Sequence, residues 1–222
     1  MNLKALGGGL FILVAMGALI FLPAWTLDYW QAWTFLTVFG VSELLITVYL
    51  IIKDPKLLER RLHGGPTAEK EASQKIIMSI VSIGFIAILV VSTLDHRFHW
   101  SSVPVPIEIA GDFLVTLGFL IIFIVFKENT FASATIKLVP GQKVISTGPY
   151  AVVRHPMYSG SLIYLMGIPI ALGSWWGVSV LTMMMPVLIW RLFDEEKLLE
   201  KNLPGYSEYM DKVKHRLVPI LW

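Results

Sequence analysis

The sequence predicts an all-α protein, a polytopic membrane bundle of five to six transmembrane helices with a C-terminal helical hairpin. Hydrophobic residues make up 55% of the chain, and the mean hydropathy is +0.68, far above that of soluble globular proteins. Long apolar runs recur along the chain, and most charged residues lie between them. Because helices that cross a bilayer need such runs, we expect an integral membrane protein.

The first two apolar runs predict two transmembrane spans. Residues 6–22 follow Lys4 and end before Pro23, so the first span has about the minimum length for a bilayer. A cleaved signal peptide is the alternative, but its apolar core would be only about 7–15 residues long. Residues 30–52 form the second span. Glu43 lies within it and is either a functional group facing the bundle interior or a hydrogen-bonded packing residue.

A charged connector and two further spans follow. Residues 53–75 carry six basic residues and are typical of a cytoplasmic loop, whose first half is predicted as an amphipathic surface helix. The third and fourth spans are predicted over residues 76–94 and 107–126, with Asp112 in the first turn of the fourth. The two histidines within residues 96–99 are expected to anchor the chain at the interface, because a third metal ligand is missing nearby.

The C-terminal part combines a polar segment with two more apolar runs. Residues 146–160 contain two proline turns, so their backbone is irregular and needs protein or ligand partners at a membrane boundary. Residues 161–172 and 175–193 are separated only by a Gly-Ser pair and predict a tight helical hairpin, although the first run is short for a full span. The polar tail from residue 194 is expected to fold back under the bundle.

The distribution of basic residues predicts the orientation of the bundle. Seventeen of the eighteen Lys and Arg residues lie at the N-terminus, in residues 53–75, in residues 127–156 and in the tail from Arg191. Only Arg97 lies on the other side. Because cytoplasmic loops are enriched in these residues, both termini and the polar segment are predicted to be cytoplasmic. The two richest polar regions can therefore meet.

We divide the chain into residues 1–126, with four spans and the 53–75 connector, and residues 127–222, a candidate catalytic region. The chain has no cysteine, which excludes disulfides, thiolate metal sites and a cysteine nucleophile. Neither a metal nor a nucleic-acid partner is expected. The glycines at 7–9 in the first span are compatible with a homodimer.

Four polar motifs occur in order in the C-terminal region. Taken singly, each has a structural explanation: Arg191 and Glu195, four residues apart, can form an intrahelical ion pair. Arg154 can extend to the membrane interface, and His155 can be a hydrogen-bonded turn residue. The motifs are Gly148-Pro149-Tyr150; Arg154-His155-Pro156 with Tyr158 and Gly160; Arg191 with Glu195 and Glu196; and Pro204-Gly205-Tyr206 with Tyr209, Arg216 and Pro219.

Together these motifs resemble the isoprenylcysteine carboxyl methyltransferase family. The resemblance covers roughly residues 135–222 and extends to a superfamily that includes phospholipid and small-thiol methyltransferases. It implies a membrane-embedded enzyme that uses S-adenosylmethionine, held in a cytoplasmic pocket, without a Rossmann-type domain. The absence of a glycine-rich nucleotide loop agrees with this implication.

The resemblance also implies roles for individual residues. Arg191 and Glu195 form the implied catalytic pair, and Arg191 and Arg154 the implied substrate-binding residues. Thr135 falls where a further cofactor contact is expected. The implied cofactor-binding residues are Gln142, Lys143, Val144, Ile145, Tyr150, His155, Pro156, Met157, Tyr158 and Glu195.

The chemistry of methyl transfer explains these residue types. The cofactor carries a sulfonium cation, with which Glu195 can pair. A carboxylate acceptor is already ionised at neutral pH and needs no base, and Arg191 would hold it as an ion pair. A thiol or amine acceptor needs a base, for which His155, Glu195 and Glu196 are the candidates.

The predicted function is therefore S-adenosylmethionine-dependent methylation of a membrane-partitioned acceptor, with protein C-terminal isoprenylcysteine carboxylate as a candidate. Phospholipids and small thiols are alternative acceptors, and membrane lipids are expected partners. An NADPH-dependent sterol or enone reductase resembles the chain around the Arg-His-Pro-x-Tyr element, but such enzymes carry a cysteine and more arginines in the last helix. A transporter or scaffold would leave the polar motifs unexplained.

Overall fold

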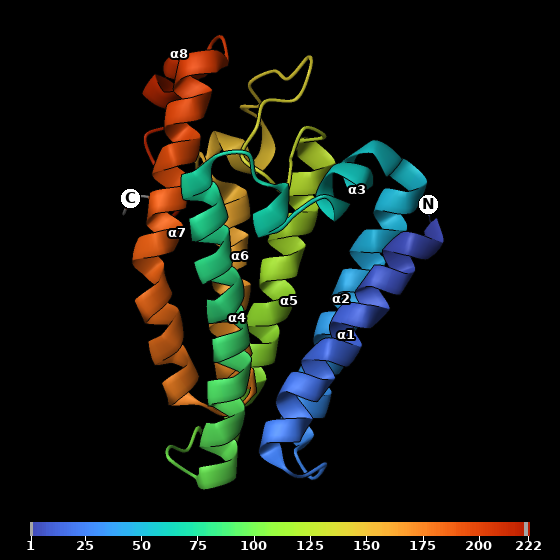
Figure 1. The fold of residues 1–222 in the computed structure, drawn as a ribbon. Coiled ribbons are helices and arrows are strands. Elements are labelled where there is room, and N and C mark those ends of the chain that lie inside the picture. Colours follow the sequence, from blue (N-terminus) through green and yellow to red (C-terminus); the bar gives the residue numbers. More distant parts are fainter. Residues whose placement is uncertain (1, 220–221) are drawn as a thin grey trace.

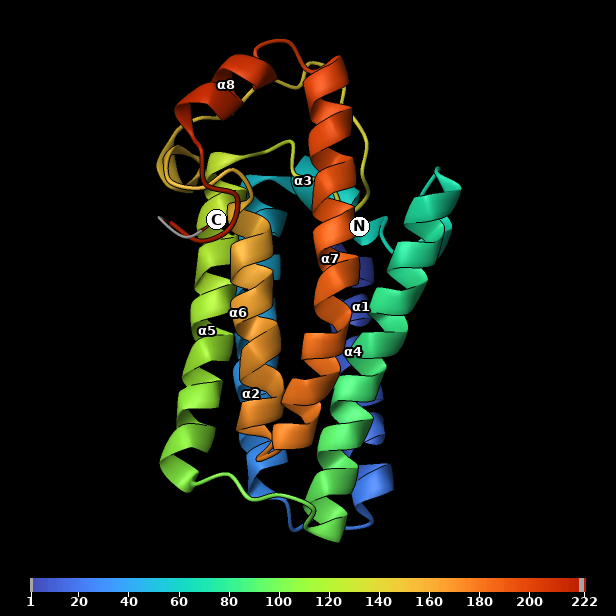
Figure 2. The same ribbon diagram turned by 90° about the vertical axis from the view of Figure 1, so that its left-hand side faces the viewer.

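The computed structural model describes residues 2–219 and 222, and this part of the chain is helical without strands. Six long helices run side by side (Figures 1 and 2). They are α1 (Asn2–Ala24), α2 (Trp30–Lys53), α4 (Ala72–Phe98), α5 (Val105–Glu128), α6 (Pro156–Ala171) and α7 (Trp175–Asn202). The shorter elements are α3 (Pro55–Leu62), α8 (Tyr206–Lys212) and the 3-10 turns η1 (Pro66–Ala68) and η2 (Gly148–Ala151).

The helices agree with a polytopic membrane protein. Five of the described helices are long and apolar enough to cross a membrane, and the sixth, α6, has only 16 residues. Helix α6 and helix α7 form the predicted hairpin, closed by Gly173 with φ of 73°. A helix is present in the first half of the connector as α3, which Asp54 caps by accepting a hydrogen bond from Leu57 N at 2.9 Å. Its position on the membrane surface stays a prediction.

Proline positions explain where the predicted helix ends were wrong. Pro23 lies inside the last turn of α1 and does not end it. Helix α5 starts at Val105, because proline is tolerated in a first turn, so Glu108 occupies that turn and Asp112 lies beyond it. Helix α6 likewise starts at Pro156, five residues before the predicted 161.

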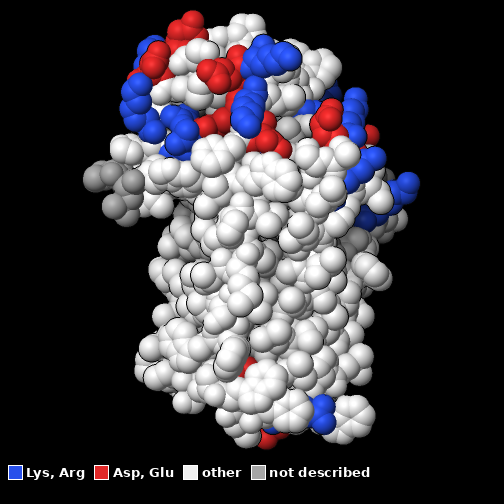
Figure 3. Space-filling view, turned by 60° about the vertical axis from the view of Figure 1, so that its left-hand side comes forward, with Lys and Arg blue, Asp and Glu red and all other residues white. Residues whose placement is uncertain are grey.

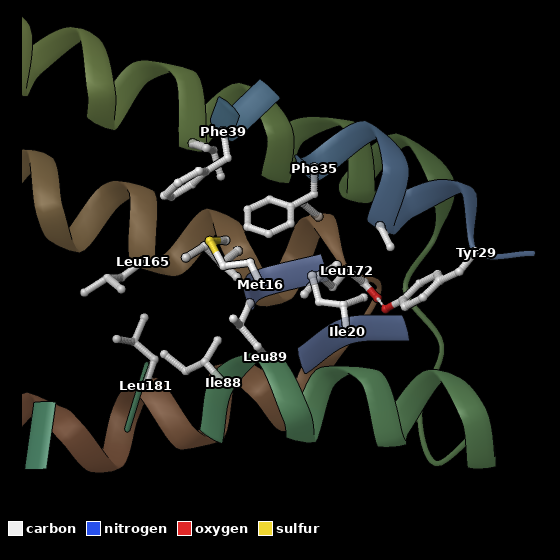
Figure 4. Close-up of a cluster of buried hydrophobic side chains, with 14 of the residues drawn as sticks. Met16, Ile20, Tyr29, Phe35, Phe39, Ile88, Leu89, Leu165, Leu172 and Leu181 are labelled. Carbon is white, nitrogen blue, oxygen red and sulfur yellow. Dashed lines mark hydrogen bonds between the residues drawn. The ribbon is translucent and has the colours of Figure 1, made fainter. Parts of the chain in front are cut away.

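The main hydrophobic core fills the space between the long helices (Figure 4). Its side chains come from α1, α2, α4, α5, α6 and α7, so all six long helices contribute to it. The Tyr29 hydroxyl donates to the Leu172 carbonyl at 2.6 Å at one edge of this core. The core residues labelled in the figure are Met16, Ile20, Tyr29, Phe35, Phe39, Ile88, Leu89, Leu165, Leu172 and Leu181.

Charged side chains gather at one end of the bundle, which we call the charged end (Figure 3). This end carries α3, α8 and the loop between α5 and α6, and both ends of the described chain lie in this half of the bundle (Figure 1). The middle of the face shown is almost free of charge. The arrangement agrees with the distribution of basic residues, and the cytoplasmic orientation of the charged end stays a prediction.

Two polar residues, Glu43 and His96, pack against neighbouring parts of the bundle. Glu43 accepts from the Thr47 hydroxyl at 2.7 Å and lies against Gly9 of α1, so it takes part in helix packing. At the opposite end of the bundle, His96 stacks on Tyr29 with 3.7 Å between ring centroids. These contacts join neighbouring helices.

Candidate active site

A cavity of about 300 Å³ lies at the charged end, between the loop of residues 129–147, α6, α7 and α8. Its volume is at the lower end of the range for small-molecule sites, roughly 300–1,000 Å³. All predicted site residues line it, although they are spread over more than fifty positions of the chain. They are Gln142, Lys143, Val144, Ile145, Tyr150, Arg154, His155, Pro156, Met157, Tyr158, Arg191 and Glu195, and Thr135 joins them.

The glycine-proline turn brings Tyr150 to the cavity wall. Gly148 has φ of 57°, which glycine adopts without the strain that a Cβ would cause, and the η2 turn follows. Asn129 donates its side-chain amide to the Tyr150 hydroxyl at 2.8 Å, and Tyr209 of α8 donates to the Tyr150 carbonyl at 2.7 Å. Burial raises the pKa of Tyr150 to about 12, so its hydroxyl is neutral and can donate a hydrogen bond at neutral pH.

The segment of residues 142–145 lines the cavity after a tight turn. The Gln142 side-chain oxygen accepts from Val139 N at 2.9 Å, and Gln142 N donates to the Val139 carbonyl at 3.0 Å. These two bonds close a turn at Gly141, whose φ is 74°. The turn exposes the following residues to the cavity while the glutamine side chain is bonded within the loop.

Glu196 joins two arginines and a histidine beside α7. It accepts from Arg154 Nε at 2.7 Å, from Arg216 Nε at 2.9 Å, and lies 3.2 Å from His155 Nε2. Arg154 N and His155 N also donate to the carbonyls of His215 and Arg216, each at 2.9 Å. The predicted return of the tail to the bundle is thereby confirmed for the described residues.

Arg154 is buried, so its interpretation as a residue extending to the membrane interface was wrong. Besides Glu196, its guanidinium donates to the backbone carbonyls of Val213 and Lys214, at 3.1 and 3.3 Å. Its side chain therefore holds the tail against the cavity wall. Its predicted contact with substrate stays a prediction.

Arg191 and Glu195 have separate partners, so the intrahelical ion pair was also wrong. Arg191 Nη2 donates to Glu69 Oε1, and Arg191 Nη1 donates to Gln74 Oε1, both at 2.8 Å. Glu195 instead accepts from the Tyr158 hydroxyl at 2.7 Å. The two residues share the cavity without neutralising each other directly.

Three residues at the site come from the connector and the start of α4, where the sequence offered only general signals. Glu69 and Gln74 contact Arg191 although each lies more than a hundred residues before it in the sequence. No spacing pattern could therefore have revealed these contacts. Arg61 of α3 lines the cavity and donates to the Ser133 carbonyl at 2.9 Å. Burial lowers the pKa of Arg61. Its membership of an Arg-Arg pair on an amphipathic helix was the one available signal.

Part of the chain matches a known protein family. The family model described as phospholipid methyltransferase matches residues 107–204, slightly less than half of the chain. That family is part of the superfamily of integral membrane methyltransferases related to isoprenylcysteine carboxyl methyltransferase. This part of the chain is therefore similar to that superfamily. No curated protein matches the chain.

The match to this methyltransferase superfamily includes most of the cavity wall. It spans α5, the loop of residues 129–147, α6 and nearly all of α7, and so contains Arg191 and Glu195. Glu69 and the tail that bonds to Glu196 lie outside the matched residues. The cavity at the charged end is therefore completed by elements on both sides of the matched region.

Proposed function

We propose that the protein transfers the methyl group of S-adenosylmethionine to a membrane-partitioned acceptor at the charged end. The observation that carries this proposal is the convergence of the predicted cofactor residues on one cavity that contains a carboxylate, Glu195, in a chain that is similar to the methyltransferase superfamily. S-adenosylmethionine supplies an activated methyl group on a positively charged sulfur.

The residues that line the cavity suit such a ligand. Glu195 presents a carboxylate, of which one oxygen accepts from Tyr158, and it can balance a positive charge. The backbone of residues 142–145 and the neutral hydroxyl of Tyr150 offer polar contacts for the remaining groups. The residues therefore bind and align the cofactor. Correct alignment of two reactants alone can lower the activation barrier of their reaction by roughly 7–11 kcal/mol.

We propose a phospholipid headgroup amine as the acceptor. Both terminal nitrogens of Arg191 already have acceptors in the protein, so an acceptor carboxylate would have to displace Glu69 or Gln74. A neutral amine needs no such displacement, and the matched family is that of phospholipid methyltransferases. Glu195 and His155 line the cavity and are candidates to take the proton that an amine loses. Isoprenylcysteine carboxylate is the second candidate.

Glu195→Ala is expected to weaken binding of S-adenosylmethionine by at least about tenfold, because a charge-assisted contact is lost. Calorimetric titration of the detergent-purified protein measures this, with NADPH as the parallel ligand. Glu200→Ala is the matched control, since Glu200 is exposed on the same helix and does not line the cavity. Binding of NADPH without binding of S-adenosylmethionine would contradict the methyltransferase proposal and favour the reductase.

The acceptor is tested by transfer of a tritiated methyl group. Vesicles of phosphatidylcholine alone, vesicles with added phosphatidylethanolamine, and a farnesylated cysteine with a free carboxylate are offered in parallel. We expect label in the lipid fraction only when phosphatidylethanolamine is present. Base-labile label on the farnesylcysteine alone would instead identify a methyl ester and favour the carboxylate acceptor.

A further inference from the structure

Glu69 is the most completely enclosed acid at the charged end, and neither the motifs nor the family match includes it. Its side chain is 1% exposed. One carboxylate oxygen accepts from Arg191 at 2.8 Å and the other accepts from Ile136 N at 3.2 Å. A buried charge is tolerated only when its partners compensate it, so this pairing is a specific feature of the site.

Arg191 has a competing partner one helical turn away. An arginine and a glutamate four residues apart on a helix attract each other, so Arg191 and Glu195 would pair by default. In the structure, Glu69 and Gln74 take both terminal nitrogens of the guanidinium. Gln74 also donates to Asp194 at 2.8 Å, which fixes the orientation of its amide between α4 and α7.

We propose that Glu69, supported by Gln74, is a positioning residue for cofactor binding, because it holds Arg191 away from Glu195. This inference rests on the proposed function. With Arg191 neutralised by Glu69, the negative charge of Glu195 remains for the positively charged sulfur of the cofactor. Without Glu69, Arg191 turns to Glu195 and cancels the charge that the cofactor needs.

The backbone conformation of the connector explains why Glu69 lies next to Arg191. Gly65 has φ of 91°, which allows the sharp turn before η1, and Glu69 follows η1 in an extended conformation. Gly64 lies so close to Ala134 that an added Cβ would be 2.8 Å from the Ala134 side chain. The connector is therefore packed directly on the loop that lines the cavity.

The charge of the ligand distinguishes this role from a purely structural one. S-adenosylmethionine carries a sulfonium cation, whereas the sulfur of S-adenosylhomocysteine is neutral, and the rest of the two molecules is the same. Loss of the negative field of Glu195 therefore weakens binding of S-adenosylmethionine more than binding of S-adenosylhomocysteine. A general loosening of the cavity would weaken binding of both ligands equally.

The test compares Glu69→Gln with Glu71→Gln, an exposed acid on the same connector. Calorimetry measures the affinity of each variant for both ligands. We expect Glu69→Gln to lower the affinity for S-adenosylmethionine by about tenfold more than the affinity for S-adenosylhomocysteine. Glu71→Gln should change neither affinity. An equal loss for both ligands, or no loss, would overturn the proposal.

One further variant keeps the test decisive if Glu69→Gln folds poorly. It combines Glu69→Gln with Arg191→Met, which removes the competing cation together with its buried partner. The double variant Glu69→Gln/Arg191→Met should recover the affinity that Glu69→Gln loses. Failure of the double variant to recover it would overturn the positioning role, whereas a wild-type protein that binds neither ligand would overturn the proposed function itself.

Discussion

Adjacent acids on α7 perform different tasks. Glu195 lines the cavity, where Tyr158 is its hydrogen-bond donor, whereas Glu196 does not line it and binds Arg154, His155 and Arg216. On a helix, neighbouring side chains point about 100° apart, so one position decides whether a carboxylate lines the cavity or pairs within the protein. The sequence motif Glu-Glu does not reveal this division.

Glu196→Gln is expected to destabilise the protein by about 3–5 kcal/mol, because it removes the charge that compensates buried Arg154 and leaves its guanidinium without a counter-ion. Thermal unfolding in detergent measures the loss, and limited proteolysis reports release of the tail. Glu195→Ala should lose ligand affinity with little change in unfolding temperature. Equal stability of the Glu196→Gln variant and the wild type would contradict the anchoring role.

At the scale of elements, the cavity depends on how closely α5 and α6 approach. Gly118 of α5 and Gly160 of α6 face each other, and a Cβ on Gly118 would lie 2.6 Å from the Gly160 carbonyl oxygen. About two helical turns further along α6, Gly167 lies against Gly111 and Val115 of α5 in the same way. This close approach positions the start of α6, and with it His155 and Tyr158, next to the loop of residues 129–147.

Gly118→Ala is expected to destabilise the bundle by about 1–3 kcal/mol, because backbone atoms of α6 must move to admit the new methyl group. Gly8→Ala in α1 is the matched control, since an added Cβ there has no atom within 4 Å. Thermal unfolding measures both variants. A loss of the same size in the control would show that helix propensity or detergent effects, and not the α5–α6 contact, determine the result.

At the scale of the whole molecule, charged residues, both chain ends and the cavity share one end of the bundle (Figures 1 and 3). An acceptor held in the bilayer and a cofactor from the aqueous phase can therefore meet where the helices leave the membrane. The distribution of basic residues predicts that this end is cytoplasmic.

Single cysteines test this orientation in intact cells, because the chain has none of its own. We expect Asp28→Cys, in the exposed turn between α1 and α2, to react with a membrane-impermeant maleimide added outside. Lys201→Cys, exposed at the charged end, should react only after permeabilisation. The reverse pattern of labelling would contradict the predicted orientation.

The sequence by itself determined the apolar helices and the hairpin, and its motifs pointed to part of the cavity wall. The spans and the hairpin are local properties, because hydropathy over about 20 residues predicts a span and prolines and glycines predict the turns between spans. The tertiary structure alone decided which charges pair. Glu69 reaches Arg191 from a connector far away in the chain, and Arg216 reaches Glu196 from the tail. Such pairings follow from the packing of α4 and the tail on α7, and no spacing within the sequence encodes them.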